Sequence, residues 1–128
     1  MKIERIEAIP YSIPYARPLK FASGEVTSAD HVLVRIYTDT GICGIADTPP
    51  RPYTYGETQD SIVSVVTKVF APQLIGLDPL DRSKVQQLLR RTVNNPTAKG
   101  ALDIALWDVI GISLDTPVHK LLGGFTDG

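Results

Sequence analysis

The chain has 128 residues and a net charge of −1, and 43% of its residues are hydrophobic. This length favours one domain, and the composition is too apolar and too weakly charged for a disordered chain. Thirteen basic residues stand against 14 acidic ones, which argues against a nucleic-acid-binding surface and against a polybasic membrane patch.

A single cysteine, Cys43, excludes an internal disulfide and a multi-cysteine zinc site. We interpret it as a small apolar filler within a strand rather than as a reactive thiol. The first residues mix acid and base without an apolar stretch, and no window approaches 18 apolar residues, so we expect no signal peptide and no membrane span. These features favour a cytoplasmic domain.

Residues 2–13 alternate in the manner of a strand. The parity of the apolar residues switches after Ala8, which indicates a bulge or an edge position, and Pro10 and Pro14 also favour an edge. Residues 14–30 have no clear period and are predicted to form a long loop. Loops of this length are uncommon and are usually functional or disordered.

A β-hairpin is predicted next. Residues 31–38 alternate strongly between an aliphatic face and a mixed face, and residues 42–47 return as a second strand. The turn between them ends at Gly41, where a positive φ is expected. Residues 48–56, which include three prolines, form a second predicted loop.

Three helices are predicted in the second half. The first covers residues 56–71, has a capping box of Thr54 and Glu57, and ends at the following proline. The second begins with Asp78 as its N-cap, followed by a proline, and runs to about residue 91. The third opens in the same way at Asn95.

Residues 98–110 of the third predicted helix are apolar over more than one face, which indicates burial on two sides. A short segment over residues 118–122 ends at two glycines. Three strands followed by three helices predict an α+β fold, in which a three-stranded antiparallel meander packs on the helices.

No catalytic constellation is complete in this sequence. His31 and His119 lack a metal-binding spacing, and neither a glycine-rich phosphate loop nor a nucleophile elbow is present. Asp103 and Asp108 lie about 140° apart on a helix and so form no carboxylate pair. We favour structural hydrogen bonds to backbone or to an arginine for both, with direct catalysis as the alternative. We expect Trp107 in the core.

The two predicted loops carry cationic and aromatic groups that suit a carboxylate substrate. The candidate substrate-binding residues are Arg17, Lys20, Phe21, Arg51, Tyr53 and Tyr55. The alternative is that these are solvated charges and tyrosines that only pack against the domain.

Two segments resemble the enolase superfamily, and within it the mandelate racemase and muconate lactonizing enzyme group: ALDIALWD over residues 101–108 and PVHKLLGG over residues 117–124. The first strand, the VLVR strand at residues 32–35 and the YGET stretch at residues 55–58 follow in family order, so the resemblance covers essentially the whole chain.

The sequence departs from the family at two places. Residues 46–48 read Ala-Asp-Thr where the family usually has Gly-Glu-Ala, which puts the role of this strand end in doubt. Asp115 replaces a common glycine, although aspartate can adopt the left-handed conformation.

The resemblance implies that residues 1–128 are an N-terminal capping domain, with residues 117–128 leading into a (β/α) barrel that the chain lacks. In such enzymes the barrel supplies the acidic ligands of Mg²⁺ and the Lys or His groups that remove a proton α to a carboxylate. A barrel needs about 250 residues. We therefore expect no catalytic or metal-binding residue in this chain, and no activity from it alone.

The resemblance also assigns the substrate contacts to residues 15–29 and 48–57. Arg17 or Arg51 would pair with a carboxylate, and the aromatic candidates would wall the pocket. One face of the helix over residues 98–112 would meet the sheet and another would meet the barrel.

A cycloisomerase, a racemase or epimerase, and an acid-sugar dehydratase all remain open as the parent enzyme. The expected partners are the barrel, a small carboxylate substrate and, in a homo-oligomer, further copies of the enzyme. The alternative from another class is a stand-alone α+β binding or assembly module without catalysis.

Overall fold

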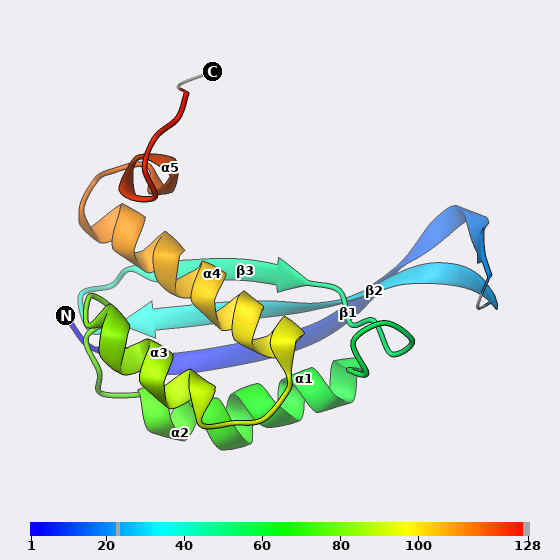
Figure 1. Ribbon diagram of the computed structural model, residues 1–128, viewed down its shortest axis with the longest axis horizontal. Coiled ribbons are helices and arrows are strands. Elements are labelled where there is room, and N and C mark those ends of the chain that lie inside the picture. Colours follow the sequence, from blue (N-terminus) through cyan, green and yellow to red (C-terminus); the bar gives the residue numbers. More distant parts are fainter. Residues whose placement is uncertain (23, 127–128) are drawn as a thin grey trace.

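The computed structural model describes residues 1–22 and 24–126 and has the α+β fold that the sequence predicts (Figure 1). Three antiparallel strands form one sheet in the order β1-β2-β3. The strands are β1 (Ile3–Phe21), β2 (Gly24–Thr38) and β3 (Cys43–Thr48). The helices are α1 (Gln59–Val65), the π-helical turn η1 (Val66–Phe70), α2 (Ala71–Leu74), α3 (Arg82–Arg90), α4 (Pro96–Ser113) and α5 (Val118–Leu121).

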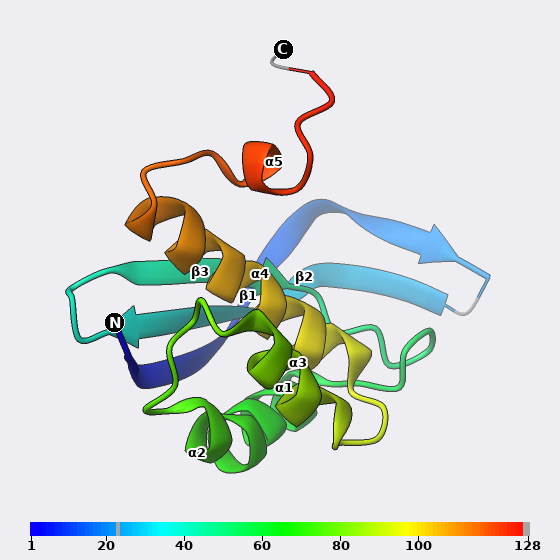
Figure 2. The same cartoon turned by 60° about the vertical axis from the view of Figure 1, so that its left-hand side comes forward.

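The helices α1 to α4 cover one face of the sheet, as Figures 1 and 2 both show. The predicted aliphatic face of the central strand points toward them, because Val32, Val34 and Ile36 are fully buried. Ile6 of β1 lies opposite Ile36, and Ala46 of β3 lies opposite Val34, so each edge strand adds its own side chain to the same core. The edge position predicted for β1 is confirmed.

Helix α4 packs unusually close to β3. A Cβ atom built on Gly44 would lie 2.1 Å from the carbonyl oxygen of Ala105 and 2.6 Å from Cγ2 of Val109. No side chain fits into such a gap without moving the backbone. Glycine at this strand position therefore sets the distance between the helix and the sheet.

The opposite side of α4 is apolar but uncovered. Ile104 is 58% exposed and Ile112 is 51% exposed, while Leu102, Leu106 and Val109 are fully buried against the sheet and its neighbours. The prediction of burial against the sheet is confirmed. The second apolar side faces outward in this chain.

The prediction of a long loop over residues 14–30 is wrong. Strands β1 and β2 continue far beyond the end of β3: Ile13 pairs with Ala29, and Leu19 pairs with Val26 after a register shift that follows Pro14. Both faces of this hairpin are exposed, so its side chains need no apolar alternation and give no strand signal. We call the described residues 12–22 and 24–30 the arm; it projects from the body in Figure 1.

The first predicted helix begins and ends about three residues later than expected, and Pro72 does not end it. The N–H of Ala71 reaches back to the carbonyl of Val66, an i−5 bond of the π-helical turn η1. The proline then falls in the first turn of α2, where its missing N–H costs nothing. The helical segment therefore continues to Leu74.

Two predicted helix starts are misplaced and one is right. The capping box at the start of α1 is formed by Thr58 and Ser61, not by Thr54 and Glu57. Helix α3 has Asp81 as its N-cap, because Asp78 instead accepts from the N–H of Leu80 in a preceding turn. The predicted start of α4 at Asn95–Pro96 is confirmed.

Two predicted left-handed positions are confirmed. Gly41 has a φ of 85° in the turn between β2 and β3, and Asp115 has a φ of 49° after α4. The aspartate thus adopts the backbone conformation for which glycine is the usual residue.

We expect Gly44→Ala to lower the free energy of unfolding by about 1–3 kcal/mol, since the added methyl group must push α4 away from β3. The matched control is Gly100→Ala within α4, where an added Cβ meets nothing within 4 Å. That change should stabilise the protein by about 0.5–1 kcal/mol. Urea unfolding of both variants measures the difference, and equal midpoints would contradict the close-packing argument.

Candidate functional site

The six predicted binding residues lie on two segments that leave the same end of the sheet (Figure 1). The cationic and aromatic residues of the arm are exposed, and so are those of the segment between β3 and α1. We call residues 49–58 the loop. Tyr53 of the loop is 86% exposed. Within residues 1–22 and 24–126, no hydrogen bond or ion pair joins one of the six side chains to another.

The loop is held in shape by its own backbone. The carbonyl oxygen of Arg51 accepts from the N–H groups of Thr54, Tyr55 and Gly56 at 3.1, 2.7 and 3.1 Å. Gly56 has a φ of 74°, which an L residue rarely adopts. This tight turn satisfies the backbone internally and leaves the side chains of Arg51, Tyr53 and Tyr55 directed away from the domain.

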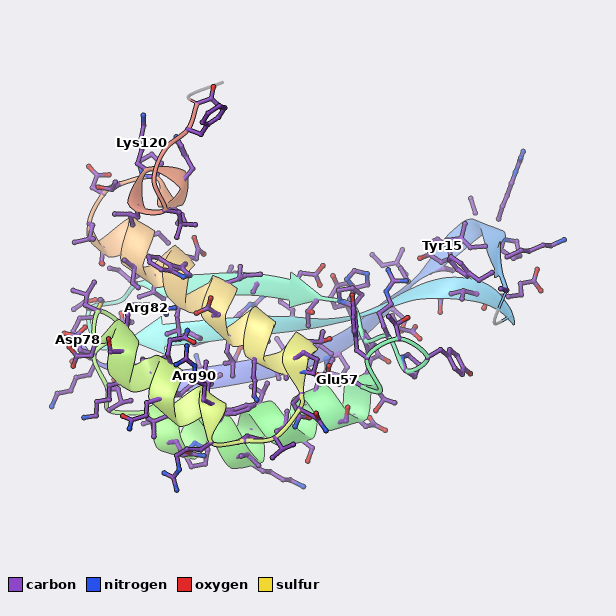
Figure 3. The ribbon with its side chains drawn as sticks, in the orientation of Figure 1. Tyr15, Glu57, Asp78, Arg82, Arg90 and Lys120 are labelled. Carbon is purple, nitrogen blue, oxygen red and sulfur yellow. The ribbon has the colours of Figure 1, made fainter. Side chains whose placement is uncertain are left out.

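Glu57 anchors the end of the loop to the start of α4 (Figure 3). Its side chain is buried, at 3% exposed, and its two oxygens accept from the N–H groups of Thr97 at 2.9 Å and of Ala98 at 3.0 Å. A carboxylate in this position satisfies free amides and opposes the positive end of the helix dipole. The sequence analysis predicted a local capping box for Glu57 instead, because a partner 40 residues away cannot be recognised from the neighbouring residues.

A polar cluster missed by the sequence analysis lies on the uncovered face of the sheet, where β3 ends. The hydroxyl of Tyr11 donates to Oδ1 of Asp47 at 2.6 Å, and Nδ1 of His31 lies 2.8 Å from Oδ2. The Tyr11 and His31 rings are 5.6 Å apart. The hydrogen bond to Asp47 is the main reason why the pKa of Tyr11 is raised above 10.0.

The two aspartates of α4 make the structural hydrogen bonds that the sequence favoured. Asp103 accepts from Arg82 and from Gln86 of α3. Asp108 accepts from the backbone N–H of Ile45 at 2.9 Å, and so satisfies a donor on the open edge of β3. Each aspartate thus joins α4 to a neighbouring element, Asp103 to α3 and Asp108 to β3.

The expectation that Trp107 lies in the core is wrong. Its ring is half-buried, and the guanidinium carbon of Arg82 lies 4.6 Å from the ring centroid. The indole thus supports the arginine that binds Asp103, through a cation–π contact between α3 and α4.

Among the described residues, no group of three or more His, Cys, Asp or Glu side chains could hold a metal ion. None of the described helices combines the length and the apolar character needed to cross a bilayer. Cys43 is half-buried in β3 and is a free thiol, as expected.

We expect Glu57→Gln to lower the free energy of unfolding by about 1–3 kcal/mol. The glutamine side chain is uncharged, and its NH₂ group would face one of the two backbone N–H groups that the carboxylate now accepts from. The control is Glu4→Gln, a change at an exposed position of β1 that should have little effect. Thermal unfolding near neutral pH compares them. A Glu57→Gln midpoint equal to that of Glu4→Gln would contradict the anchoring role.

Comparison with known proteins identifies the domain. Residues 5–123 match the family described as mandelate racemase / muconate lactonizing enzyme, N-terminal domain. An N-succinyl-L-Arg/Lys racemase from Bacillus cereus is 31% identical, over 97% of this chain and 34% of the racemase.

Two solved structures are also similar. A muconate lactonizing enzyme from Mycobacterium smegmatis, complexed with muconolactone, is 58% identical with a TM-score of 0.95, over 99% of this chain and 35% of that one. A dipeptide epimerase from Enterococcus faecalis, complexed with Mg and L-Leu-L-Tyr, is 30% identical with a TM-score of 0.91, over 98% and 35%.

The chain spans about a third of the length of these relatives, and their names cover racemase, epimerase and cycloisomerase-type enzymes. The family match extends over nearly the whole chain, and the fold agrees with it. The chain therefore belongs to the N-terminal domain family of the mandelate racemase and muconate lactonizing enzymes, within the enolase superfamily.

Proposed function

We propose that this chain is the substrate-specificity cap of a Mg²⁺-dependent enzyme that abstracts a proton α to a carboxylate. The relatives are about three times as long as this chain, and one of them was crystallised with Mg and a dipeptide. The described residues of this chain contain no cluster that could hold the metal. We assign the metal and the acid–base groups to a barrel that follows residues 117–128, as the resemblance implies.

The observation that carries this proposal is the position of the arm and the loop. Both leave the sheet at one end (Figure 1), and both carry exposed cationic and aromatic side chains. The guanidinium of Arg17 or Arg51 can bind a substrate carboxylate with two parallel hydrogen bonds. Phe21, Tyr53 and Tyr55 offer apolar walls, and Lys20 is a second cation nearby on the arm.

The uncovered side of α4 supplies a surface for the barrel. Ile104 and Ile112 of α4 are more than half exposed, and so is Leu122 beyond the helix. Exposed apolar side chains of this size become favourable when another surface covers them. Phe125 is fully exposed, and α5 has no buried residue, so the chain leaves the domain on this side.

In this arrangement the cap does not perform the chemistry. It closes the barrel mouth, excludes water and binds the part of the substrate that is distant from the reacting carbon. The mixture of arginine and aromatic side chains favours a small, partly apolar carboxylate as substrate. We place the parent enzyme in the cytoplasm as a homo-oligomer, and its single unpaired cysteine in this domain is compatible with that.

In the full-length enzyme, we expect Arg51→Ala to raise KM for the carboxylate substrate about tenfold or more, because the charge-assisted hydrogen bonds from the guanidinium are lost. Tyr53→Ala should change the preference among substrates that differ in their apolar part. The control is Arg90→Ala on α3, remote from the arm and the loop (Figure 3). Steady-state kinetics with unchanged KM and preference in both loop variants would remove these residues from the site.

We expect residues 1–128 alone to show no turnover at any Mg²⁺ concentration, because the barrel groups are missing. The coding sequence of the natural gene is the companion measurement, and it should continue past Gly128 into a barrel with spaced Asp and Glu ligands. A stop codon after Gly128 would instead favour the stand-alone binding module, and measurable activity of residues 1–128 would refute the division of labour.

A further inference from the structure

The loop is flanked by two residues that bind the same pair of residues at the base of the arm, Tyr11 and His31. Asp47 immediately precedes Thr48 and the loop, and Gln59 immediately follows the loop at the start of α1. Asp47 contacts the side chains of Tyr11 and His31, whereas Gln59 contacts the backbone of the same two residues. The two ends of the loop are thus both connected to one point on the hairpin.

That point is the root of the arm. Tyr11 and His31 are register partners, one step beyond the pair Pro10–Val32, and Val32 lies opposite Thr48 at the end of β3. Beyond this position the arm no longer has a third strand beside it. Any rotation of the arm relative to the body must therefore pass through the Tyr11–His31 pair.

Four hydrogen bonds hold this pair. Nε2 of Gln59 donates to the carbonyl oxygens of Tyr11 at 2.8 Å and of His31 at 3.0 Å. The carboxylate of Asp47 accepts from the Tyr11 hydroxyl at 2.6 Å and from the His31 ring at 2.8 Å. Side chains and backbone of the pair are therefore both engaged, by residues from opposite ends of the loop.

The arm and the loop also face each other across a hollow of about 220 Å³. It is lined by Asp30 of the arm, by Pro50, Pro52 and Thr58 of the loop, and by Gln59 and Asp60 of α1. The rest of the arm is held only by its own strand pairing and by local bonds such as those from Ser12 and Ser28 to Asp30. The connection to the loop is concentrated at the root.

We propose that Tyr11, His31, Asp47 and Gln59 form a clasp that couples the arm to the loop, so that the two segments close over a substrate as one unit. These four are positioning residues, since they act through Arg17, Phe21, Arg51 and the tyrosines rather than by touching substrate. The substrate part of this inference rests on the proposed function, whereas the mechanical coupling does not. The clasp also gives Asp47 a role at the strand end where the sequence departs from the family.

The coupling is tested by changing one segment and measuring the other in the intact protein. Gln59→Leu, read by amide hydrogen exchange over the arm, should raise exchange by up to about tenfold, because two hydrogen bonds are lost. Tyr11→Phe removes one hydrogen bond, so amide exchange over the loop should rise about threefold. Asp47→Glu keeps the carboxylate and should restore most of the protection that Asp47→Ala removes.

Matched controls exist for both changes. Gln73→Leu removes an amide that donates within its own helical segment, to the carbonyl of Val69, and Tyr15→Phe removes an arm hydroxyl outside the clasp. Neither should alter exchange in the opposite segment. If Gln59→Leu and Tyr11→Phe behave like these controls, the clasp is refuted whatever the substrate proves to be.

Kinetics of the full-length enzyme separate the two proposals. With the clasp intact, the combined effect of Phe21→Ala and Tyr55→Ala on KM should differ from the sum of their separate free-energy effects. In a protein that also carries Gln59→Leu, the two effects should be additive. Gln59→Leu alone should raise KM severalfold, within about tenfold, and leave kcat nearly unchanged. Non-additivity that persists in Gln59→Leu refutes the clasp. Cross-segment exchange effects with no KM effect in any arm or loop variant uphold the clasp and refute the proposed function.

Discussion

The close approach of α4 to β3 at Gly44 is the contact on which the rest of the domain depends. An 18-residue helix lies on the sheet with its Ala105 carbonyl where a strand side chain would otherwise stand. This contact sets the distance of the helix from the sheet, and separate contacts then orient its two ends. The first turn meets Glu57 at the end of the loop, and the last turn directs the chain toward α5. Asp108 adds a polar bond on the same edge, to the N–H of Ile45.

The domain consequently has a rigid body and two less supported surfaces. Among the described residues, the buried face of the sheet and the inner sides of α1, η1, α2, α3 and α4 form one hydrophobic core cluster. The arm, by contrast, exposes Ile13, Leu19 and Phe21, and α4 exposes Ile104 and Ile112. Exposed apolar groups of this size cost solubility in an isolated chain and become favourable when another surface covers them. The distribution of apolar residues therefore fits a domain built to lie against a larger body.

The parts of the fold that were predictable from sequence are those in which burial imposes a period. The strand around Val34 and the helix around Leu106 each have one buried face, so their apolar spacing identified them. The arm has no buried face, and its pairing depends on backbone hydrogen bonds that every sequence can make. The helix does not end at Pro72 for a related reason. One i−5 hydrogen bond places the proline in the first turn of α2, and the sequence gives no sign of that bond.

The candidate site was predictable only in part. The resemblance to a known family directed attention to two segments, which the structure places at the same end of the sheet (Figure 1), and the residue types suggested a carboxylate ligand. The interactions that position those segments were not visible, because each joins residues far apart in the chain. Glu57 binds the start of α4 some 40 residues away, and Gln59 binds carbonyls 28 and 48 residues away. Such partners become apparent only when the register of β1 with β2 is known.

This division between core and periphery leaves the exposed side chains of the arm and the loop free to differ while the fold stays the same. The relatives named as racemase, dipeptide epimerase and muconate lactonizing enzyme share this fold, with TM-scores above 0.9 at identities as low as 30%. In this chain the exposed residues of the arm and the loop contribute nothing to the buried core, so changing them leaves Gly44 and its contacts intact. The clasp adds a constraint of its own. The types of side chain at the arm tip and in the loop can change independently of one another. The positions of the two segments cannot, because Tyr11 and His31 bind residues at both ends of the loop.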